Sequence, residues 1–405
     1  MIFLLIPLFG ITQEYIPKSS TYHELDVSIG WMGNSNSNFP KHRLQKNIFL
    51  NFGQDHSGGL KDWEYYLNGP KTGISLGFSD LGNPSNLGYA YSILPYVEFA
   101  LFPEKTDNLS LLLAFGGSYV TKKYDLETNP YNKGVSTHVN WSYKSSILYN
   151  VFKGDKSTWR IGLGYFHYSN GHVRKPNRGY NSVLLSVLAS FEKKPNFVDS
   201  VPSNIPSRSI YWYYEARLGV GINSFSDVFK DKKPVYAVSL SGGKVINRTF
   251  KYGLGLYYHF YQHYYDYIIN DETLIRTQEP QFANRSILNA SRLGIFGSAE
   301  LLLGQVGMEM NIGLNVFKPF YIIDWQLNKG YTQFVNGEEI IVLGEMNSYY
   351  KIKKHVFSRM GLKYYFIDMD SKSRHNIYVG AFINANLGQA DFSELTVGYV
   401  HKFDF

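Results

Sequence analysis

Residues 159–192, WRIGLGYFHYSNGHVRKPNRGYNSVLLSVLASFE, form two segments in which apolar side chains recur at every second position, on either side of a polar loop. Because successive side chains of a β-strand point to opposite faces, each segment is predicted to be a strand with one apolar face. The stripe of the first strand consists of Ile161, Leu163, Tyr165, His167 and Ser169. The stripe of the second strand begins with Asn181. Polar side chains thus stand at adjoining ends of two apolar stripes, and this is where we expect chemistry.

The composition of the chain limits its class. A chain of 405 residues could form two or three soluble domains or one large β-barrel. Its aromatic fraction of 17% is high and suits the aromatic girdles found at membrane interfaces. The net charge of +7 is spread along the chain. This distribution favours contact with an anionic membrane surface over a dedicated groove for nucleic acid, so no nucleic-acid partner is expected. Cysteine is absent, which excludes disulfides and thiolate metal sites.

Residues 1–12 are predicted to be a signal peptide. Their apolar run has the length of a signal-peptide core and is too short to cross a bilayer, although no Lys or Arg precedes it. A buried first strand is the alternative. Because no later segment has 18 consecutive apolar residues, a membrane form of this protein must be a β-barrel.

Alternating segments recur along the chain and divide it in two. Eight candidate strands lie in the first half, at 20–192, and eight more in the second half, at 211–405. Residues 193–210 contain three prolines and are interpreted as a linker. The first half carries the candidate site. We predict an all-β, antiparallel transmembrane barrel of about sixteen strands in one closed wall, with two tandem eight-stranded barrels as the alternative.

The connections between the strands support a barrel. Those after even-numbered strands are short, whereas those after odd-numbered strands include the long segments 268–290 and 318–354. Outer-membrane barrels combine short turns with long external loops in this way. A polar, helix-like segment near 61–67 is the exception. The last strand ends in Phe405, and a terminal aromatic residue on an alternating strand is similar to the insertion signal of outer-membrane barrels.

The two halves share a short motif. FHYSNG at 166–171 aligns with FINANL at 382–387, and both segments precede a loop and an alternating strand. The second copy has Ile and Ala where the first has His167 and Ser169. If the second half is a duplicated unit, the polar pair is a feature that the barrel wall does not itself require.

His167 and Ser169 are the candidate catalytic pair. Residues i and i+2 of a strand share a face, so the imidazole can take the hydroxyl proton and leave a nucleophilic oxygen. Asn181 can orient the ring, because its side-chain oxygen accepts from a ring N–H as the Asn of Cys–His–Asn proteases does. It cannot neutralise the imidazolium, so it is expected to give weaker support than a carboxylate. The alternative is a polar pair in the interface girdle of the barrel.

A longer string around this pair carries a family resemblance. It reads His167-x-Ser169-Asn170-Gly171 and, after four further residues, Pro176-Asn177-x-Gly179-x-Asn181. This string resembles the PagL-type lipid A 3-O-deacylases, outer-membrane barrels whose active site lies on the outside of the wall and faces the lipid. The resemblance is close over 160–192 and looser over the rest of the first half. In the second half it is limited to the architecture.

The resemblance implies a role for each residue of the string. Ser169 corresponds to the nucleophile and His167 to its general base. Asn181 stands where the best-known members have a glutamate, so the strength of the triad differs here. The oxyanion is expected to be met by donors at Asn170, Gly171 and Asn177. The family barrel has about half the length of this chain, so the resemblance leaves the second half unexplained.

The loop between the two strands is strongly basic. Its basic side chains, which we expect to meet lipid A phosphates at the level of the headgroups, are His172, Arg174, Lys175 and Arg178. A solvated external loop is the alternative reading.

The predicted function is a serine esterase of the Gram-negative outer membrane that removes an ester-linked 3-O acyl chain from lipid A or lipopolysaccharide. No metal or cofactor is expected. An acyl ester in the membrane would reach the outward stripe by moving sideways. The alternatives are a non-catalytic porin or transport channel, and a surface barrel whose long loops hold a ligand.

Other polar residues are given structural roles. His259 and His263 have the HxxxH spacing, but we predict that they lie in an interface girdle and bind no metal. Glu300 and Glu309 are predicted to fill a polar barrel interior.

Overall fold

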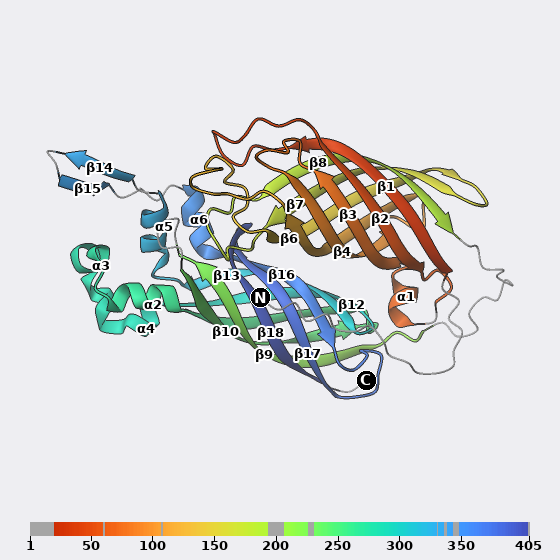
Figure 1. Cartoon of the computed structure of the whole chain (residues 1–405). Helices are drawn as coiled ribbons and strands as arrows, with labels where there is room; N and C mark the ends of the chain where they lie inside the picture. The colour runs from red at the N-terminus through yellow and green to blue at the C-terminus, as the bar shows by residue number, and fades with distance from the viewer. Residues whose placement is uncertain are drawn as a thin grey trace.

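The chain forms two closed antiparallel β-barrels of eight strands each (Figure 1). This computed structural model describes residues 20–59, 61–106, 108–192, 206–225, 231–329, 331–335, 338–342 and 348–403. The predicted signal peptide, most of the predicted linker and the terminal Phe405 lie outside the described residues. The expectation of one sixteen-stranded wall is wrong, and the alternative of two tandem barrels is confirmed, because β8 pairs with β1 and closes the first wall before the second begins.

The first barrel contains the strands β1 to β8. Their bounds are β1 Ser20–Met32, β2 Gln45–Asp55, β3 Lys71–Asp80, β4 Tyr89–Ala100, β5 Leu109–Val120, β6 Val139–Lys153, β7 Thr158–Ser169 and β8 Tyr180–Glu192. Each strand pairs with its neighbour in sequence, and β8 returns to β1. The helix-like segment in the β2–β3 connection is the short helix α1, Asp62–Tyr66.

The second barrel repeats this up-and-down order. Its wall strands are β9 Ile210–Ser224, β10 Lys232–Ile246, β11 Phe250–Tyr261, β12 Ser291–Leu303, β13 Val306–Phe317, β16 Val356–Tyr365, β17 His375–Asn386 and β18 Gln389–Lys402. Each half of the chain thus contains the eight wall strands that alternation predicts. Ile383 and Ala385 lie on β17, the seventh strand of this barrel, as His167 and Ser169 lie on β7, the seventh strand of the first.

The long connections of the second barrel carry local structure that alternation did not predict. After β11 come α2 Gln262–Ile269, α3 Thr273–Gln278, a 3-10 helix Pro280–Arg285 and α4 Ser286–Asn289. After β13 come α5 Tyr321–Lys329, the hairpin β14 Tyr331–Val335 and β15 Glu338–Val342, and α6 Ser348–His355. The strand β11 therefore ends at Tyr261, where the chain turns into α2. No helix within the described residues is long and apolar enough to cross a bilayer.

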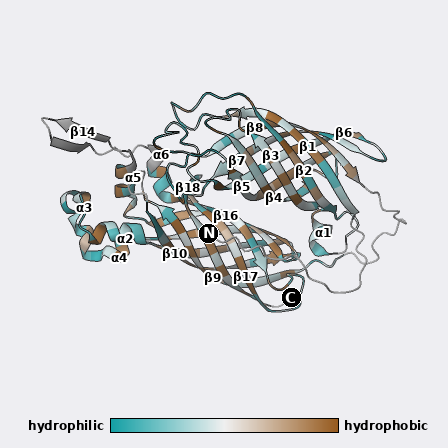
Figure 2. Cartoon of the chain, in the orientation of Figure 1, coloured by the Kyte–Doolittle hydropathy of each residue, from teal (hydrophilic) through white to brown (hydrophobic). Residues whose placement is uncertain are grey.

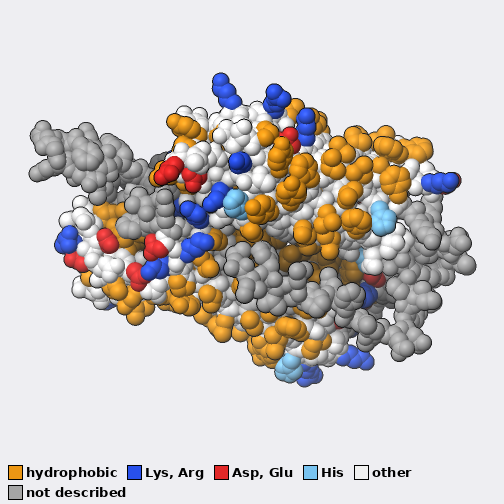
Figure 3. Space-filling model, in the orientation of Figure 1, with side chains coloured by type: hydrophobic (Ala, Val, Ile, Leu, Met, Phe, Trp, Pro, Cys, Tyr) orange, Lys and Arg blue, Asp and Glu red, His pale blue; other side chains and the backbone are white. Residues whose placement is uncertain are grey.

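The outward faces of both walls are apolar, as Figures 2 and 3 show. Residues with more than half of their surface exposed include Leu163 and Leu185 on the first barrel and Leu218 and Leu395 on the second. The side chains that alternate with them point inward and are buried. An apolar exterior around a polar interior is the inverse of a soluble protein and is the arrangement of transmembrane barrels.

Charged side chains inside the first barrel are paired. Arg160 donates to both Glu24 and Glu98, and Lys144 donates to Asp26. An eight-stranded barrel has a lumen just wide enough for side chains to fill, so these pairs lie among packed aromatic rings such as Phe49 and Phe166. Because an unpaired charge in such a place is costly, the network accounts for the polar positions on the inward face.

The second barrel has a larger ionic network. Lys251 donates to Glu215 and Glu300, and Lys363 contacts these two carboxylates and Glu309. Arg359 contacts Glu309 and Glu394. The prediction that Glu300 and Glu309 fill the interior is therefore confirmed.

The prediction that His259 and His263 lie in an interface girdle is wrong. His259 points into the second barrel, where its Nδ1 lies 2.7 Å from a guanidinium nitrogen of Arg292. His263 lies on α2, outside the barrel wall, and is buried. The chain leaves the strand between them, so the two side chains do not share a strand face.

The two barrels lie side by side and contact each other near both ends (Figure 1). At the loop end, Trp141 on β6 donates from Nε1 to the Ser393 hydroxyl on β18 at 2.9 Å. At the turn end, Arg248 and Asp62 form an ion pair at 3.5 Å. Because each contact joins equivalent ends of the barrels, both walls point in the same direction.

The interior pairs generate a stability prediction. Replacing Arg160 with Met should destabilise the protein by about 3–5 kcal/mol, because Glu24 and Glu98 would be left buried without their cation. The measurement is urea unfolding in detergent micelles. Arg276→Met is the matched control, since it removes an Arg from an exposed pair with Asp271 and should cost at most about 1 kcal/mol. Equal effects of the two changes would contradict this account.

The filled interiors also generate a conductance prediction. Both lumens hold buried ion pairs and aromatic side chains, so the purified protein should give no stepwise conductance in planar lipid bilayers. Reproducible conductance steps from correctly folded protein would restore the channel alternative.

Candidate active site

The outward faces of β7 and β8 place the predicted histidine and asparagine side by side. His167 lies directly opposite Asn181 in the strand register. The His167 Nδ1 and Asn181 Oδ1 atoms are 2.7 Å apart, and the Tyr165 hydroxyl donates to the same oxygen at 2.6 Å. Because an amide oxygen only accepts, its partner Nδ1 carries the hydrogen, which leaves Nε2 as the basic nitrogen. The arrangement thus fixes both the orientation and the tautomer of the ring.

Ser169 is the last residue of β7 and is 5% exposed. Its Oγ accepts from the Gly171 N–H at 3.2 Å and from the Asn177 side-chain amide at 2.8 Å. Two of the three residues proposed from the sequence as oxyanion donors, Gly171 and Asn177, therefore converge on the candidate nucleophile. Within the described residues no hydrogen bond joins this hydroxyl to the His167 ring, and such catalytic contacts often tighten only when substrate binds.

Asn170 organises the loop that carries these donors. Its N–H donates to Asn177 Oδ1 at 3.0 Å, so this N–H is directed at the neighbouring amide and away from the serine oxygen. Its side-chain amide donates to the Arg174 carbonyl at 2.7 Å, and its Oδ1 accepts from the His172 N–H at 2.9 Å. Asn170 thereby holds Asn177 in the orientation in which its amide reaches Ser169.

Gly179 shapes the space beside the histidine. Its φ of +74° lies in the left-handed region, and a Cβ at this position would lie 2.7 Å from His167 Cε1. A larger residue would therefore both strain the backbone and displace the imidazole. The structure therefore explains why the string has glycine at position 179.

Two residues at the site were not predicted from the sequence. Trp141 on β6 lies opposite Ser169 in the register and shares its outward face. Ser393, from the second barrel, accepts from Trp141 and donates to the Gly171 carbonyl at 3.2 Å. The strand register could have indicated Trp141. Nothing in the local pattern around 159–192 indicates Ser393.

The predicted phosphate contacts do not form one cluster. Lys175 Nζ donates to the Phe225 carbonyl of the second barrel at 2.8 Å. The exposed Arg178 directs its guanidinium toward the Ser35 carbonyl at 3.5 Å. The Arg174 carbonyl accepts from within the loop. The three residues therefore serve partly to fold the loop and attach it to its surroundings.

His172 does not contribute the positive charge expected of it. Its carbonyl accepts from the Ser224 N–H at 3.0 Å, so the residue lies at the contact between the barrels. Burial, with a smaller contribution from the Lys175 ammonium, lowers the pKa of the imidazole to about 3. His172 is consequently neutral at physiological pH.

The geometry has the elements of acyl transfer. A serine hydroxyl has two converging donors, and a histidine two residues away is oriented by an amide oxygen. Ser169, His167 and Asn181 lie on the outward faces of β7 and β8, above the apolar stripe that ends in Tyr165, and Asn177 lies in the loop between these strands. No group of three or more His, Cys, Asp or Glu residues suited to a metal ion occurs in the described part of the chain. The fold and site thus define a transmembrane barrel with a serine and a histidine on the outward face of its wall.

A family comparison agrees with this class. The model of the family described as lipid A 3-O-deacylase (PagL) matches residues 48–190. The match begins in β2 and ends in β8, so it covers most of the first barrel and includes every predicted site residue. It does not extend into the second barrel.

Other comparisons add less. A search of curated proteins finds no match. Among solved structures, a mutant of the Rh. blastica porin is 9% identical, with 95% of this chain and 100% of that chain covered and a TM-score of 0.18. The COG4313 outer membrane channel from Pseudomonas putida F1 is 10% identical, with coverages of 96% and 97% and a TM-score of 0.17. Pseudomonas aeruginosa OccK1 is 10% identical, with coverages of 96% and 100% and a TM-score of 0.20. At these TM-scores the similarity carries no argument about this chain.

Proposed function

We propose that this protein is a lipid A 3-O-deacylase of the Gram-negative outer membrane, in which Ser169 and His167 hydrolyse an ester-linked acyl chain. The observation that carries the proposal is the convergence of the Gly171 N–H and the Asn177 amide on the Ser169 oxygen, inside the region that the deacylase family matches. The position on the outward wall supports a substrate already in the membrane. The proposal also includes that residues 1–12 are a signal peptide.

The reaction begins with acylation of the serine. His167 Nε2 takes the Ser169 proton as the oxygen attacks the ester carbonyl, and Asn181 holds the ring through Nδ1. The carbonyl oxygen becomes an oxyanion that the Gly171 N–H and the Asn177 amide stabilise. Donors of this kind contribute roughly 3–4 kcal/mol each in comparable enzymes. Asn170 acts through Asn177 as a positioning residue.

The intermediate then collapses and is hydrolysed. The bond to the sugar oxygen breaks, and this oxygen takes the proton from His167, which leaves an acyl-serine. Water attacks the acyl-serine with His167 again as the base, the bond to Ser169 breaks, and the serine regains its proton. The products are a free hydroxy fatty acid and a sugar hydroxyl, so no redox partner or cofactor is needed.

The wall supplies the acyl-binding surface. Ile161 and Leu163 are about half exposed and continue the stripe of the catalytic pair toward the turn end. An acyl chain lying along this stripe would bring its ester to the level of Ser169. The basic residues Arg174, Lys175 and Arg178 belong to the loop at headgroup level, where charge-assisted contacts to lipid phosphates are favourable.

The first test is mass spectrometry of lipid A from cells that express the wild type, Ser169→Ala or Ser145→Ala. Only proteins with an intact nucleophile should remove one 3-hydroxyacyl mass, and Ser169→Ala should lose at least about 10³-fold in rate. Ser145 is the matched control, because it lies on the outward face of the neighbouring strand β6, opposite Tyr165, and within the described residues makes no hydrogen bond to Ser169, His167 or Asn181. Folding is checked by heat-modifiable gel mobility.

Unchanged lipid A in cells that contain folded wild-type barrel, tested across lipid A species from a plausible host, would refute the proposal. Equal deacylation by wild type and Ser169→Ala would refute the role of the serine. A different group would then have to be the nucleophile.

A second test concerns Asn181. Replacing it with Glu places a carboxylate against Nδ1, which stabilises the imidazolium that forms during reaction, so kcat should rise by roughly tenfold. Asn181→Leu removes the acceptor and should lower kcat by roughly 10–100-fold with a smaller change in KM. The reaction is followed by release of fatty acid from lipid A in micelles. If Leu and Asn gave the same kcat, Asn181 would have no orienting role.

A further inference from the structure

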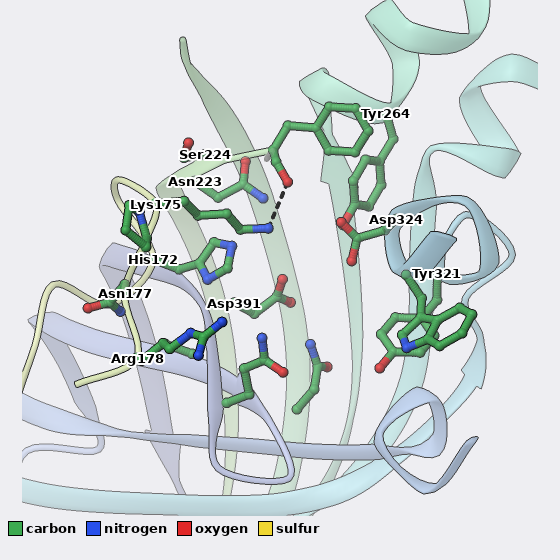
Figure 4. A pocket seen from close by; sticks show the side chains of 16 residues that line it. His172, Lys175, Asn177, Arg178, Asn223, Ser224, Tyr264, Tyr321, Asp324 and Asp391 are labelled. Carbon is green, nitrogen blue, oxygen red and sulfur yellow. Dashed lines mark hydrogen bonds between the residues drawn. The ribbon is translucent and has the colours of Figure 1, made fainter. Parts of the chain in front are cut away.

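A polar cavity of about 140 Å³ lies at the loop end, between the β7–β8 loop of the first barrel and the second barrel. Figure 4 shows His172, Lys175, Asn177 and Arg178 on one side of it and Tyr264, Tyr321 and Asp324 on the other. Neither barrel alone forms this cavity. Any ligand in it would contact both halves of the chain.

The cavity adjoins the catalytic serine through one side chain. Asn177 lines the cavity, and its side-chain amide donates to Ser169 Oγ at 2.8 Å. A group bound in the cavity is therefore next to the residue that contacts the reacting hydroxyl. When an ester lies against Ser169, the cavity is on the side where the polar part of the lipid would be.

Two buried polar side chains of the second barrel lie beside this space. Asn223 and Ser224, at the end of β9, are 3% and 1% exposed. In the described part of the chain, Asn223 Oδ1 and the Ser224 hydroxyl have no hydrogen-bond partner, although both residues line the cavity. Burying a polar group without a partner costs free energy, so a rotation that turns either side chain into the cavity would let a ligand complete its hydrogen bonds.

The charges of the cavity suit an anionic, hydroxylated ligand. Lys175 and Arg178 bring two cations from the loop. The carboxylate of Asp391 at its floor is already paired, since Arg292 donates to it at 2.8 Å and the Tyr261 hydroxyl at 2.7 Å. Asp324 on α5 is the second acidic side chain that lines the cavity. Cations bind phosphate through charge-assisted hydrogen bonds, and amide and hydroxyl groups bind sugar hydroxyls.

The size and the walls suit one sugar ring. An engineered cavity of about 150 Å³ in another protein binds benzene, so a space of about 140 Å³ accepts a six-membered ring. Tyr321 and Trp325 line one side and offer aromatic surface to the apolar face of such a ring, beside Tyr264, whose own ring stacks on those of Tyr261 and Phe320. A site with aromatic walls and a few placed polar groups is typical of small-ligand pockets.

We propose that this cavity binds one phosphorylated pyranose of the headgroup of the lipid substrate, and that the second barrel thereby supplies half of the headgroup site. The inference rests on the proposed deacylase function and adds a role for the second barrel. The sugar occupies the space between Asn177 and the β9 end, its hydroxyls bond Asn223 and Ser224, and its phosphate meets Lys175 and Arg178. The acyl ester then lies against Ser169.

The binding arm of the test uses the full chain in detergent micelles and a soluble probe, the fully deacylated, bisphosphorylated glucosamine disaccharide. Isothermal titration calorimetry should detect binding to the wild type. Asn223→Leu and Ser224→Val, which remove polar groups from the cavity wall, should weaken it at least tenfold. Arg178→Gln, an exposed change that spares the fold, should weaken it severalfold. Ser190→Val is the matched control, because it alters a buried, unpartnered hydroxyl inside the first barrel and should stay within twofold.

The catalytic arm compares kcat/KM for lipid A with kcat/KM for a long-chain ester without sugar. The ratio should fall at least tenfold in Asn223→Leu and Ser224→Val and stay unchanged in Ser190→Val. An unchanged ratio together with lost disaccharide binding would mean a site for free saccharide and would overturn the assignment to the substrate headgroup. Unchanged disaccharide binding in both cavity variants and in Arg178→Gln, or no binding to the wild type, would overturn the site itself.

The two proposals fail separately. If the wild type hydrolysed neither ester but bound the disaccharide in a manner sensitive to Asn223 and Ser224, the deacylase proposal would fall and the saccharide site would stand. If the wild type hydrolysed lipid A while the cavity variants kept the wild-type ratio and affinity, the deacylase proposal would stand and the role of the second barrel would fall.

Discussion

Closure of each wall after eight strands is the constraint on which the rest of the structure depends. A lumen of this width admits side chains and little else, so every charge that points inward must find a partner inside. The Arg160 pairs in the first barrel and the Lys251 and Lys363 network in the second meet this requirement. Because the lumen is filled, a binding surface has room only on the outer wall or at the loop end. The serine and histidine of the candidate site stand on the outer wall, and the cavity stands at the loop end.

The sequence predicts the strands well and the closure poorly, for one physical reason. Alternation is a local property, so it identifies all sixteen wall strands, including β7 and β8 around the site. Whether β8 pairs with β1 or with β9 is a contact between distant segments that leaves no mark on either strand's periodicity. The helices after Tyr261 escape prediction because an aromatic, polar segment can continue a strand or start a helix, and contacts at the loop end decide between them.

The candidate site, too, is predictable where local sequence decides it and unpredictable where distant segments do. The stripe on β7 and the first residue of the β8 stripe predict that His167 and Asn181 are neighbours, since antiparallel pairing sets their register. The loop residues follow from the string of asparagines and glycines, yet their division of labour does not, because Asn170 turns out to hold Asn177 rather than to face the serine. The neutral state of His172 and the position of Ser393 depend on the second barrel. No reading confined to 159–192 could have included them.

The covalent connection between Glu192 and Ile210 has a consequence for assembly in the membrane. Two separate barrels would have to meet by diffusion in a crowded bilayer, and their pairing would depend on how much of each is made. Here the connection leaves from the turn end of the first barrel and enters the turn end of the second, which fixes a one-to-one ratio and a common direction of insertion. Joining two partners in this way replaces a bimolecular encounter with an effective local concentration in roughly the millimolar range. The contact between Trp141 and Ser393 therefore forms within one molecule and is independent of how dilute the protein is in its membrane.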